Sequence, residues 1–274
     1  MGYNLLEATL AGVAFSSLSE NEDELVLVDI IEEEAKMDTQ TIPLVMKDGL
    51  MRTVNRRKSL SVKLVFCIRT QDVARRAELR DAVAAWAMKG GALKTNTRPG
   101  KQLSVKCDEP AALQSSAKWT DELTLTLTAY AVPYWQDAEV TLYGGETTLL
   151  HSGENWLADV YSIGGQLDAL VAATIINKGA APLTHIKLQC GSTMMELDGI
   201  NIQPNMPLLI SYDNDNLLFI EDFFKLDGSD KSLFAYRTAD SSDDLIAAPD
   251  VDNQIIVSAD SAVSVSLTTR GLWL

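Results

Sequence analysis

The chain has 274 residues, of which 46% are hydrophobic and 22% charged, and its net charge is −15. This length predicts two domains or one large all-β domain. A chain of this size can bury a core that is stable without disulfides or structural metals, and its composition does not fit a disordered chain. The charge is uneven: residues 1–138 hold 17 Lys and Arg against 19 Asp and Glu (net −2), and residues 139–274 hold 6 against 19 (net −13), which argues against nucleic-acid binding by the second half.

The first half is predicted to contain strands around one helix. Residues 25–31 form a β-branched run that ends in an acidic triplet, and residues 42–46 form an apolar run before the turn Lys47-Asp48-Gly49. In residues 59–68, apolar and polar side chains alternate with period two. This alternation indicates an antiparallel strand with one buried face.

A helix is predicted directly after this strand. Asp72 is placed to cap its first turn, with Thr70 as the other candidate. Apolar residues recur near helical spacing up to Met88, and Lys89-Gly90-Gly91 then supplies a cation for the last turn and a glycine for a left-handed cap. Trp86 shares the apolar positions, so we expect it in the core rather than at a ligand.

The rest of the first half returns to strands and turns. In order, these are a short strand at 93–96, a turn at 98–101, and strands at 103–107 and 123–130. The last strand has the cleanest pattern in the chain, because hydrophobic residues on one face alternate with threonine and alanine on the other. Pro133 and Asp137 stop it. We therefore expect a domain boundary at about residue 138, which gives domains 1–138 and 139–274.

The second half is predicted to be β, with polar turns between short strands. Strands are expected at residues 140–142, 147–150, 169–176, 184–189, 194–197, 208–212, 217–220, 254–258 and 263–268. Many short strands with polar turns indicate a β-sandwich of jelly-roll type, and the acidic segment 229–249 is predicted to be a long loop. The expected fold class is mainly β: an α+β first domain with one helix packed on a β-sandwich, then a second β-sandwich.

The cysteines and the first residues of the chain indicate the cellular compartment in which the protein is made. Cys67, Cys107 and Cys190 are far apart and odd in number. They form no CxxC pair, so we expect neither a zinc site nor a full disulfide framework, but small buried thiols in a protein made in a reducing cytosol. The first residues lack the pattern of a secretion signal, and no apolar stretch is long enough to span a membrane.

Sequence motifs of common enzymes are missing. The chain has no G-x-S-x-G elbow, no G-x-x-x-x-G-K-[ST] phosphate loop, and only two histidines, His151 and His185. His185 lies inside a predicted strand, where we expect a hydrogen-bonded structural histidine. No catalytic, cofactor-binding or metal-binding residue is therefore assigned, and no cofactor is expected.

Two charged clusters suggest sites but have simpler explanations. Four carboxylates lie near aromatic residues: Asp213, Asp215, Glu221 and Asp222. A glycosidase needs two carboxylates at a defined separation, which a sequence does not show, and the likeness of residues 213–216 to a calcium loop lacks the required Gly and distal Glu. The basic cluster consists of Arg52, Arg56, Arg57 and Lys58. It fits a nucleic-acid contact, or more simply a solvated loop or an inter-subunit contact.

Five motifs follow one another in the first half, and their order is typical of a known family. They are the turn at 46–49, the strand at 60–68, the helix that ends in Trp86-Ala87-Met88-Lys89-Gly90-Gly91, the segment 93–106 with Arg98-Pro99-Gly100, and the strand at 123–130 that runs into Pro133-Tyr134-Trp135. In this order the first half resembles the N-terminal domain of siphophage distal tail proteins (the Dit family). The closing strand with Pro-Tyr-Trp is the most specific motif.

The second half adds two motifs. Residues 175–183 match an Asn-x-Gly-x-x-Pro turn, and residues 263–274 match a final strand with an aromatic stop. Both resemble the galectin-like C-terminal β-sandwich of the same family, so the resemblance spans nearly the whole chain. The residues with which galectins bind sugars are not found, and the second half holds only Arg237 and Arg270 as arginines. The resemblance therefore implies the fold rather than sugar binding.

The resemblance implies a structural, non-enzymatic phage or prophage protein of the virion tail tip, made in the bacterial host cytoplasm. Its first domains would form a hexameric hub ring that joins the tail tube to the tail tip or baseplate, and the genome would pass through without sequence-specific binding. Expected partners are further copies of the chain, the tail tube protein, a tail-tip hub or tail-associated protein and a receptor-binding protein anchored by the second domain; membrane insertion is not expected. Segment 14–36 is the candidate arm or belt of the ring.

Two other functions remain open. The alternative is a carbohydrate-binding adhesion module formed by the second domain. Trp156 or Tyr161 exposed beside a groove would favour it, and burial of these rings would count against it. A hydrolase is the third possibility, and it would need a cleft with a carboxylate of raised pKa.

Overall fold

The structure is a computed structural model that describes residues 6–21, 23–33, 36–43, 50–108, 120–160, 163–212, 218–222 and 232–274. The chain forms two compact units, Met1–Trp135 (unit 1) and Gln136–Leu274 (unit 2). Strands dominate both units, and the described residues contain a single α-helix. The predicted fold class, mainly β with one helix, is confirmed. Strand β9 (Trp135–Asp137) crosses from unit 1 into unit 2.

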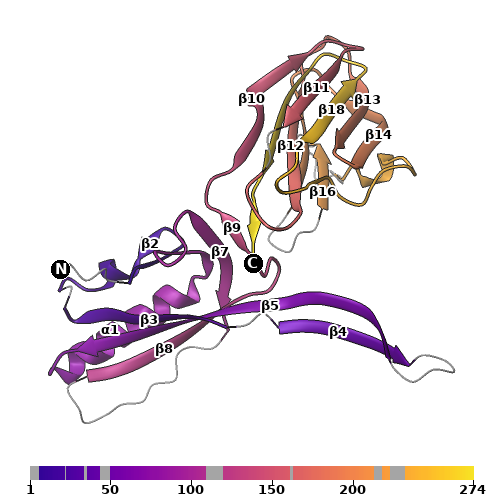
Figure 1. Ribbon diagram of the computed structural model, residues 1–274. Helices are drawn as coiled ribbons and strands as arrows, with labels where there is room; N and C mark the ends of the chain where they lie inside the picture. The colour runs from indigo at the N-terminus through magenta and orange to yellow at the C-terminus, as the bar shows by residue number, and fades with distance from the viewer. Residues whose placement is uncertain are drawn as a thin grey trace. The chain divides into compact units, whose positions relative to one another are not determined.

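Unit 1 is built around a path of hydrogen-bonded strands in the order β2-β1-β6-β7-β8-β5-β3 (Figure 1). The bounds are β1 Ala8–Leu10, β2 Val13–Ala14, β3 Leu25–Glu32, β4 Lys36–Pro43, β5 Leu50–Arg69, β6 Gly91–Thr95, β7 Lys101–Cys107 and β8 Thr120–Ala129, with a 3-10 turn η1 at Phe15–Leu18. Strand β5 is the central element, since β3 and β8 both pair with its second half and β4 pairs with its first half.

The predicted alternation of residues 60–68 is the reason why the second half of β5 is a core strand. Every second side chain points into the core and is at most 6% exposed: Leu60, Val62, Leu64, Phe66 and Ile68. Strand β8 supplies a matching row on its own inward face, with Leu123, Leu125 and Leu127 buried. Burial of one face of two paired strands fixes their register, because a slip by one residue would turn each apolar row to solvent.

Helix α1 (Val73–Met88) begins and ends as predicted. The Asp72 carboxylate accepts a hydrogen bond from the Ala74 N–H (2.9 Å), and Gly90 adopts the left-handed conformation (φ +59°) just after the helix. The helix packs against β5, β7, β8 and η1. Trp86 is 1% exposed, and its ring meets Phe66 edge to face at 6.2 Å, so the expectation of a core tryptophan is confirmed.

Segment 14–36 is not an arm, contrary to the expectation from the sequence. Phe15 in η1 and Leu25 and Leu27 in β3 are at most 7% exposed, and β3 pairs with the core half of β5. The first part of the apolar run therefore belongs to the core of unit 1, whereas Val28 and Ile31 further along β3 are exposed. The element that extends past the core strands is the hairpin formed by β4 and the first half of β5 (Figure 1).

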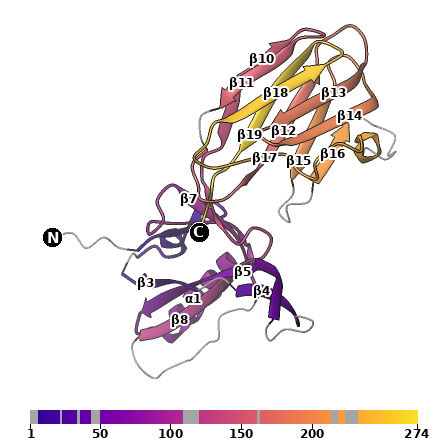
Figure 2. The same ribbon diagram turned by 45° about the vertical axis from the view of Figure 1, so that its right-hand side comes forward.

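Unit 2 is a β-sandwich of two antiparallel sheets (Figure 2). One sheet has the order β10-β19-β12-β15-β16, with β17 on β12, and the other has the order β11-β18-β13-β14. The bounds are β10 Thr141–Leu150, β11 Asn155–Val160, β12 Ala169–Asn177, β13 Leu183–Cys190, β14 Thr193–Ile202, β15 Pro207–Tyr212, β16 Leu218–Asp222, β17 Ile246–Ala247, β18 Asn253–Ala259, β19 Val263–Thr269 and β20 Leu272–Trp273, with a 3-10 turn η2 at Phe234–Tyr236.

Period-two patterns build the core between these sheets. Alternate residues of β12, β18 and β19 are buried, and they form one hydrophobic cluster with residues of β13 and β14. Ile175 and Val265 come from one sheet, and Ile186 and Val257 come from the other, each at most 1% exposed. Two sheets that each bury one apolar face on the other make a complete core without a helix.

The Asn-x-Gly-x-x-Pro turn has a physical explanation in Asn177, which is 0% exposed. Its amide NH₂ donates to the carbonyls of Ala181 (2.9 Å) and Ile202 (2.8 Å), and its Oδ1 accepts from the Gly179 N–H (3.0 Å) and the Ser261 hydroxyl (2.9 Å). A Cβ on Gly179 would lie 2.1 Å from the Ser261 Oγ, so only glycine fits there. The asparagine thus joins three chain segments within unit 2.

Candidate functional site

The projecting hairpin of unit 1 is the feature that core packing does not explain; we call residues 36–43 and 50–59 the ribbon. Its pairs run from Lys36↔Ser59 to Pro43↔Leu50. Strand β3 pairs with β5 only from Val62 onward, and β8 only from Leu60 onward. The ribbon is therefore a two-stranded extension of a wider sheet.

The ribbon has open edges. Strand β3 continues into β4 in nearly the same register along β5, so these two strands occupy one edge of β5 in succession. Among the described strands, none pairs with the other edge of residues 50–59 or with the outer edge of β4. Unpaired edges expose rows of N–H and C=O groups that can bind a strand of another chain. An isolated two-stranded hairpin is also only marginally stable in water, so the ribbon is expected to need a partner surface.

The root of the ribbon is held by cation–aromatic contacts and one ion pair. Arg57 lies over the Tyr134 ring at 5.0 Å. Arg98 donates to both carboxylate oxygens of Glu32 (3.1 and 2.8 Å) and lies over the Trp135 ring at 5.8 Å, and the Trp135 indole N–H also donates to Glu32. These contacts explain the most specific sequence motif, Pro-Tyr-Trp, since both of its aromatic rings bind arginine side chains near the ribbon.

The basic cluster noted in the sequence falls on this ribbon. All four residues lie in the first half of β5: Arg52, Arg56, Arg57 and Lys58. The guanidinium of Arg57 is engaged with Tyr134 rather than free for phosphate. Position on a strand with an unpaired edge favours the inter-subunit interpretation over the nucleic-acid one, because such an edge can bind a strand of another chain.

Comparisons with known proteins find similarity in the structure alone. No protein-family model matches the sequence, and no curated protein matches it. Among solved structures, the Dit protein (gp19.1) of phage SPP1 matches with a TM-score of 0.62 and 10% sequence identity, over 97% of this chain and 99% of that one. The chain has the Dit fold. The resemblance predicted from the motifs is therefore confirmed at the level of the fold.

The SPP1 structure is described as a paradigm of the hub adsorption apparatus in phages that infect Gram-positive bacteria. Two phage P2 baseplate structures, in an activated conformation with Ca and with Sr, match with TM-scores of 0.47 and 0.49 at 8% identity, over 90% and 98% of this chain and of theirs. At 10% identity, the SPP1 match supports the fold of the chain and not its activity.

The thiols of this Dit fold are less uniform than predicted. Cys190 is buried in unit 2, and burial raises the pKa of its thiol to about 11, which keeps it protonated and unreactive. Cys67 and Cys107 in unit 1 are only half-buried, so the prediction of a buried thiol is right for Cys190 alone. Cys67 lies on the outward face of β5, between the buried Phe66 and Ile68, whereas Cys107 ends β7 on the same face as the buried Leu103 and Val105.

The carboxylate cluster of the sequence contributes little to a site. Asp213 and Asp215 lie outside the described residues, as does the side chain of Asp222, and Glu221 is half-buried at the end of β16. Throughout the part of the chain that the structure describes, no group of three or more His, Cys, Asp or Glu side chains could hold a metal ion. Across the same ranges, no helix has the length and apolarity to cross a membrane.

His185 is hydrogen-bonded, as predicted, and has a carboxylate partner. Its Nε2–H donates to the Glu196 Oε1 on the neighbouring strand β14 (2.8 Å), and the Thr238 hydroxyl donates to the other carboxylate oxygen (3.3 Å). The hydrogen bond from His185 is the main reason why the pKa of Glu196 lies below its ordinary value. The pair holds the chain after η2 against β14, where the Thr238 N–H also donates to the Glu196 carbonyl (3.0 Å).

This pair predicts a pH dependence of the stability of unit 2. A depressed carboxyl pKa contributes stability that is present above the unfolded value of about 4.5 and is lost as the pH falls through the lower folded value. Wild-type protein should therefore lose more stability than Glu196→Gln between pH 5 and pH 3. The side chains are 36% and 24% exposed, so the difference should stay below about 1 kcal/mol. Urea unfolding at both pH values measures it, and a larger loss in the variant would refute the assignment.

Proposed function

We propose that this chain is a structural hub protein of a phage tail tip and assembles as a hexameric ring between the tail tube and the tip or baseplate. Unit 1 forms the ring, the genome passes through its channel without sequence-specific binding, and unit 2 carries receptor-binding proteins. The observation that carries this proposal is the Dit fold over 97% of the chain. The role is structural, without catalysis or cofactor, and its place is the virion tail tip after synthesis in the host cytoplasm.

The open edges of the ribbon support ring formation. A ring needs a heterologous interface, in which one patch of a subunit binds a different patch of the next. The ribbon supplies one such patch, because residues 50–59 of β5 expose an edge in line with β8. The neighbouring subunit would bind this edge by adding a strand, as in other cases of strand addition. Further copies of this chain are thus the first partners, with the tube protein and a tail-associated protein above and below the ring.

A shortened ribbon tests this proposal. Lys36 and Ser59 are cross-strand partners, so an Asn-Gly turn that joins them directly closes the sheet without residues 37–58. We expect the full chain to form multimers in light scattering and the shortened chain to stay monomeric. The control is the far-ultraviolet circular dichroism of both proteins, which should show equal helix content from α1. Multimers of unchanged mass in the shortened chain would contradict a role of the ribbon in assembly.

A carbohydrate-binding module in unit 2 is the second candidate. Trp156 and Tyr161 cannot decide it, since the Trp156 side chain and all of Tyr161 lie outside the described residues. The favouring observation is a pair of exposed aromatic rings on η2, Phe234 (44%) and Tyr236 (42%). Exposed rings next to polar groups are suited to stack on sugars. A glycan screen with and without Phe234→Ala and Tyr236→Ala separates this candidate from the hub, which needs no glycan affinity.

A further inference from the structure

The segment after β19 returns to the beginning of unit 2. The Asp137 N–H donates to the Gly271 carbonyl (2.9 Å). The Arg270 guanidinium donates through Nη1 to two successive carbonyls, those of Asp137 (2.9 Å) and Ala138 (2.7 Å). Hydrogen bonds from a charged donor are stronger than neutral ones. Residues 137 and 138 are thus held by a segment more than 130 residues later in the chain.

Two further residues complete this contact. The Trp273 indole N–H donates to the Asp137 Oδ1 (3.0 Å). The Gln166 N–H donates to the Leu272 carbonyl (2.7 Å), and its side-chain oxygen accepts from the Leu274 N–H (2.9 Å). Residues 270–274 therefore lie between the start of unit 2 and the turn around Gln166, and they bind both.

Glycines make this close approach possible. A Cβ on Gly271 would lie 2.0 Å from the Gly164 carbonyl oxygen and 2.3 Å from the Asp137 carboxylate. A Cβ on Gly165 would lie 2.8 Å from the Leu272 carbonyl oxygen. Glycine is therefore required at these positions for close packing as well as for turns. Without side chains at Gly164, Gly165 and Gly271, three backbone segments can approach one another directly.

We propose that residues 270–274 act as a latch that sets the length of the tether between the two units. With the latch closed, residues 137 and 138 are part of unit 2, and the tether is the junction at Trp135–Gln136. With the latch open, β9 keeps its pairing with β7, and residues 138–140 become tether up to the start of β10 at Thr141. At roughly 3.4 Å per extended residue, this adds about 10 Å of reach.

The latch can open without unfolding the sandwich. It is held by the polar contacts above and by Leu272, which is half-buried and packs against the core of unit 2. Trp273 is half-buried and Leu274 is 47% exposed, whereas β19 just before the latch lies within the core. Segments with few buried apolar contacts open locally at a lower free energy than the core. The hydrogen bonds of the latch all lie within unit 2 and are independent of the proposed function.

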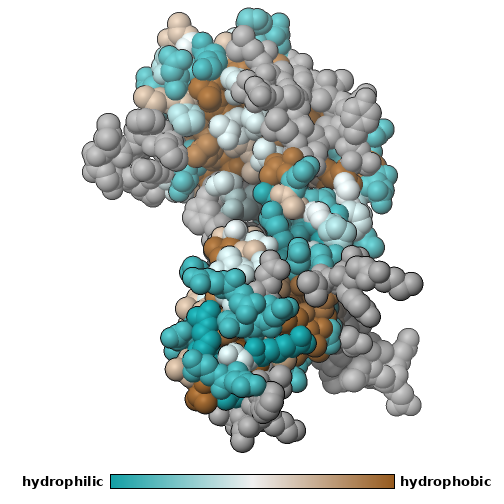
Figure 3. Space-filling model, turned by 90° about the vertical axis from the view of Figure 1, so that its left-hand side faces the viewer, coloured by the Kyte–Doolittle hydropathy of each residue, from teal (hydrophilic) through white to brown (hydrophobic). Residues whose placement is uncertain are grey.

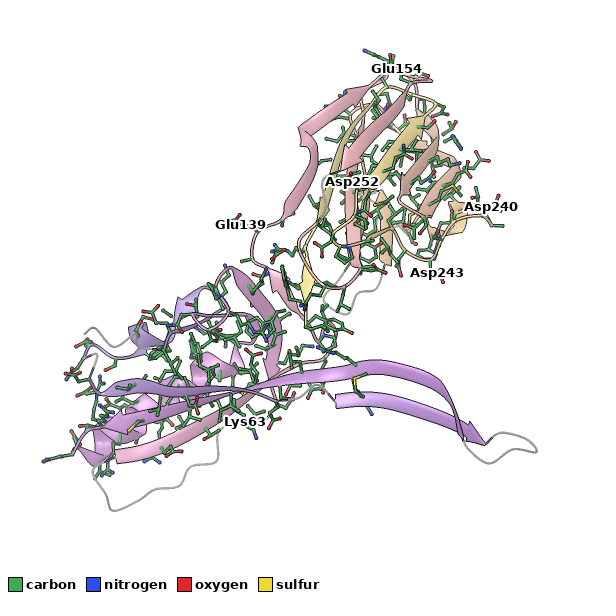
Figure 4. All side chains as sticks on the ribbon, viewed as in Figure 1. Lys63, Glu139, Glu154, Asp240, Asp243 and Asp252 are labelled. Atoms are coloured by element: carbon green, nitrogen blue, oxygen red, sulfur yellow. The ribbon has the colours of Figure 1, made fainter. Side chains whose placement is uncertain are left out.

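Proteolysis at Glu139 tests the latch. Glu139 lies between β9 and β10, and Glu154 lies in the turn between β10 and β11; both are exposed and labelled in Figure 4. A Glu-specific protease cleaves an exposed site only when the chain around it opens. In the full chain with Arg270→Met and Trp273→Phe, three hydrogen bonds of the latch are lost while the apolar parts of both side chains remain. We expect cleavage after Glu139 to become tenfold to roughly hundredfold faster, with cleavage after Glu154 unchanged.

Arg237→Met is the matched control, because Arg237 is the other arginine of the second half and donates to the Ser242 carbonyl away from the latch. It should leave cleavage after Glu139 at the wild-type rate. Hydrogen exchange gives a second readout: the amides of Asp137, Gln166 and Leu274 should exchange faster together in the double variant. An unchanged rate at Glu139, or equal acceleration at Glu139 and Glu154, would overturn the proposal, and so would the same acceleration in Arg237→Met.

Discussion

Replacement of Trp86 by alanine is expected to cost unit 1 about 3–5 kcal/mol of unfolding free energy. The indole is 1% exposed and packs edge to face on Phe66, which in turn meets Phe15 at 5.7 Å. Its N–H donates to the Val13 carbonyl (2.8 Å), so the variant leaves both a cavity and an acceptor without its donor. Because domains are stable by only about 5–15 kcal/mol, this loss is a large share of the total.

The measurement is urea unfolding followed by circular dichroism at 222 nm, to which α1 contributes strongly. Trp86→Phe is the matched control, since it keeps an aromatic ring and removes the donor; it should cost about 1–2 kcal/mol. A loss below about 1 kcal/mol for Trp86→Ala would mean that the contact of α1 with β5 and η1 does not hold unit 1 together. Figure 3 shows one face of the molecule, on which hydrophilic residues are interspersed with hydrophobic patches.

Replacement of Asn177 by aspartate is expected to cost unit 2 about 3–5 kcal/mol at neutral pH. The shape is almost unchanged, but two donors to the Ala181 and Ile202 carbonyls are lost, and a charge is placed at a site that is 0% exposed. Burial disfavours the charged form, so the folded pKa of the new carboxyl should lie above its unfolded value of about 3.9.

The sign of the pH effect follows from this pKa. Between the unfolded and the raised folded value, the folded state binds more protons, so the stability of Asn177→Asp should fall as the pH rises from about 4 and then level off. Thermal unfolding at pH 4 and pH 7 measures the difference from wild type at each pH. The control is Asn201→Asp, at an exposed asparagine of β14, which should change stability by less than about 0.5 kcal/mol. Equal, small losses in both variants would contradict the role of Asn177.

The parts of the fold that depend on residues close together in the sequence were predicted correctly. The cap at Asp72, the left-handed Gly90 and the alternation of residues 60–68 all follow from neighbours in the chain. The turn at Asn177 was recognised as a motif, but its partners Ile202 and Ser261 are 25 and 84 residues away, so its bonds could not be derived from spacing.

The predicted turn at 47–49 lies outside the described residues. The length of the ribbon and the latch were missed for a related reason. Residues 50–58 carry no apolar alternation in the sequence, and their strand is recognised only through its backbone pairing with β4. The apolar run of residues 25–31 instead suggested an arm, although Leu25 and Leu27 of this run belong to the core through β3. The latch depends on Arg270 meeting Asp137, a contact across 133 residues for which neither position carries a signal.

Native mass spectrometry of the full chain tests the ring most directly. A closed hub ring should give a species of six times the 29.9 kDa chain mass, whose share grows with concentration, without an open-ended series of larger multimers. Negative-stain images of the same sample should then show rings with a central hole. A single chain at every concentration, or a ladder of multimers that never closes at six, would contradict the claim that this Dit fold forms the hub ring by itself.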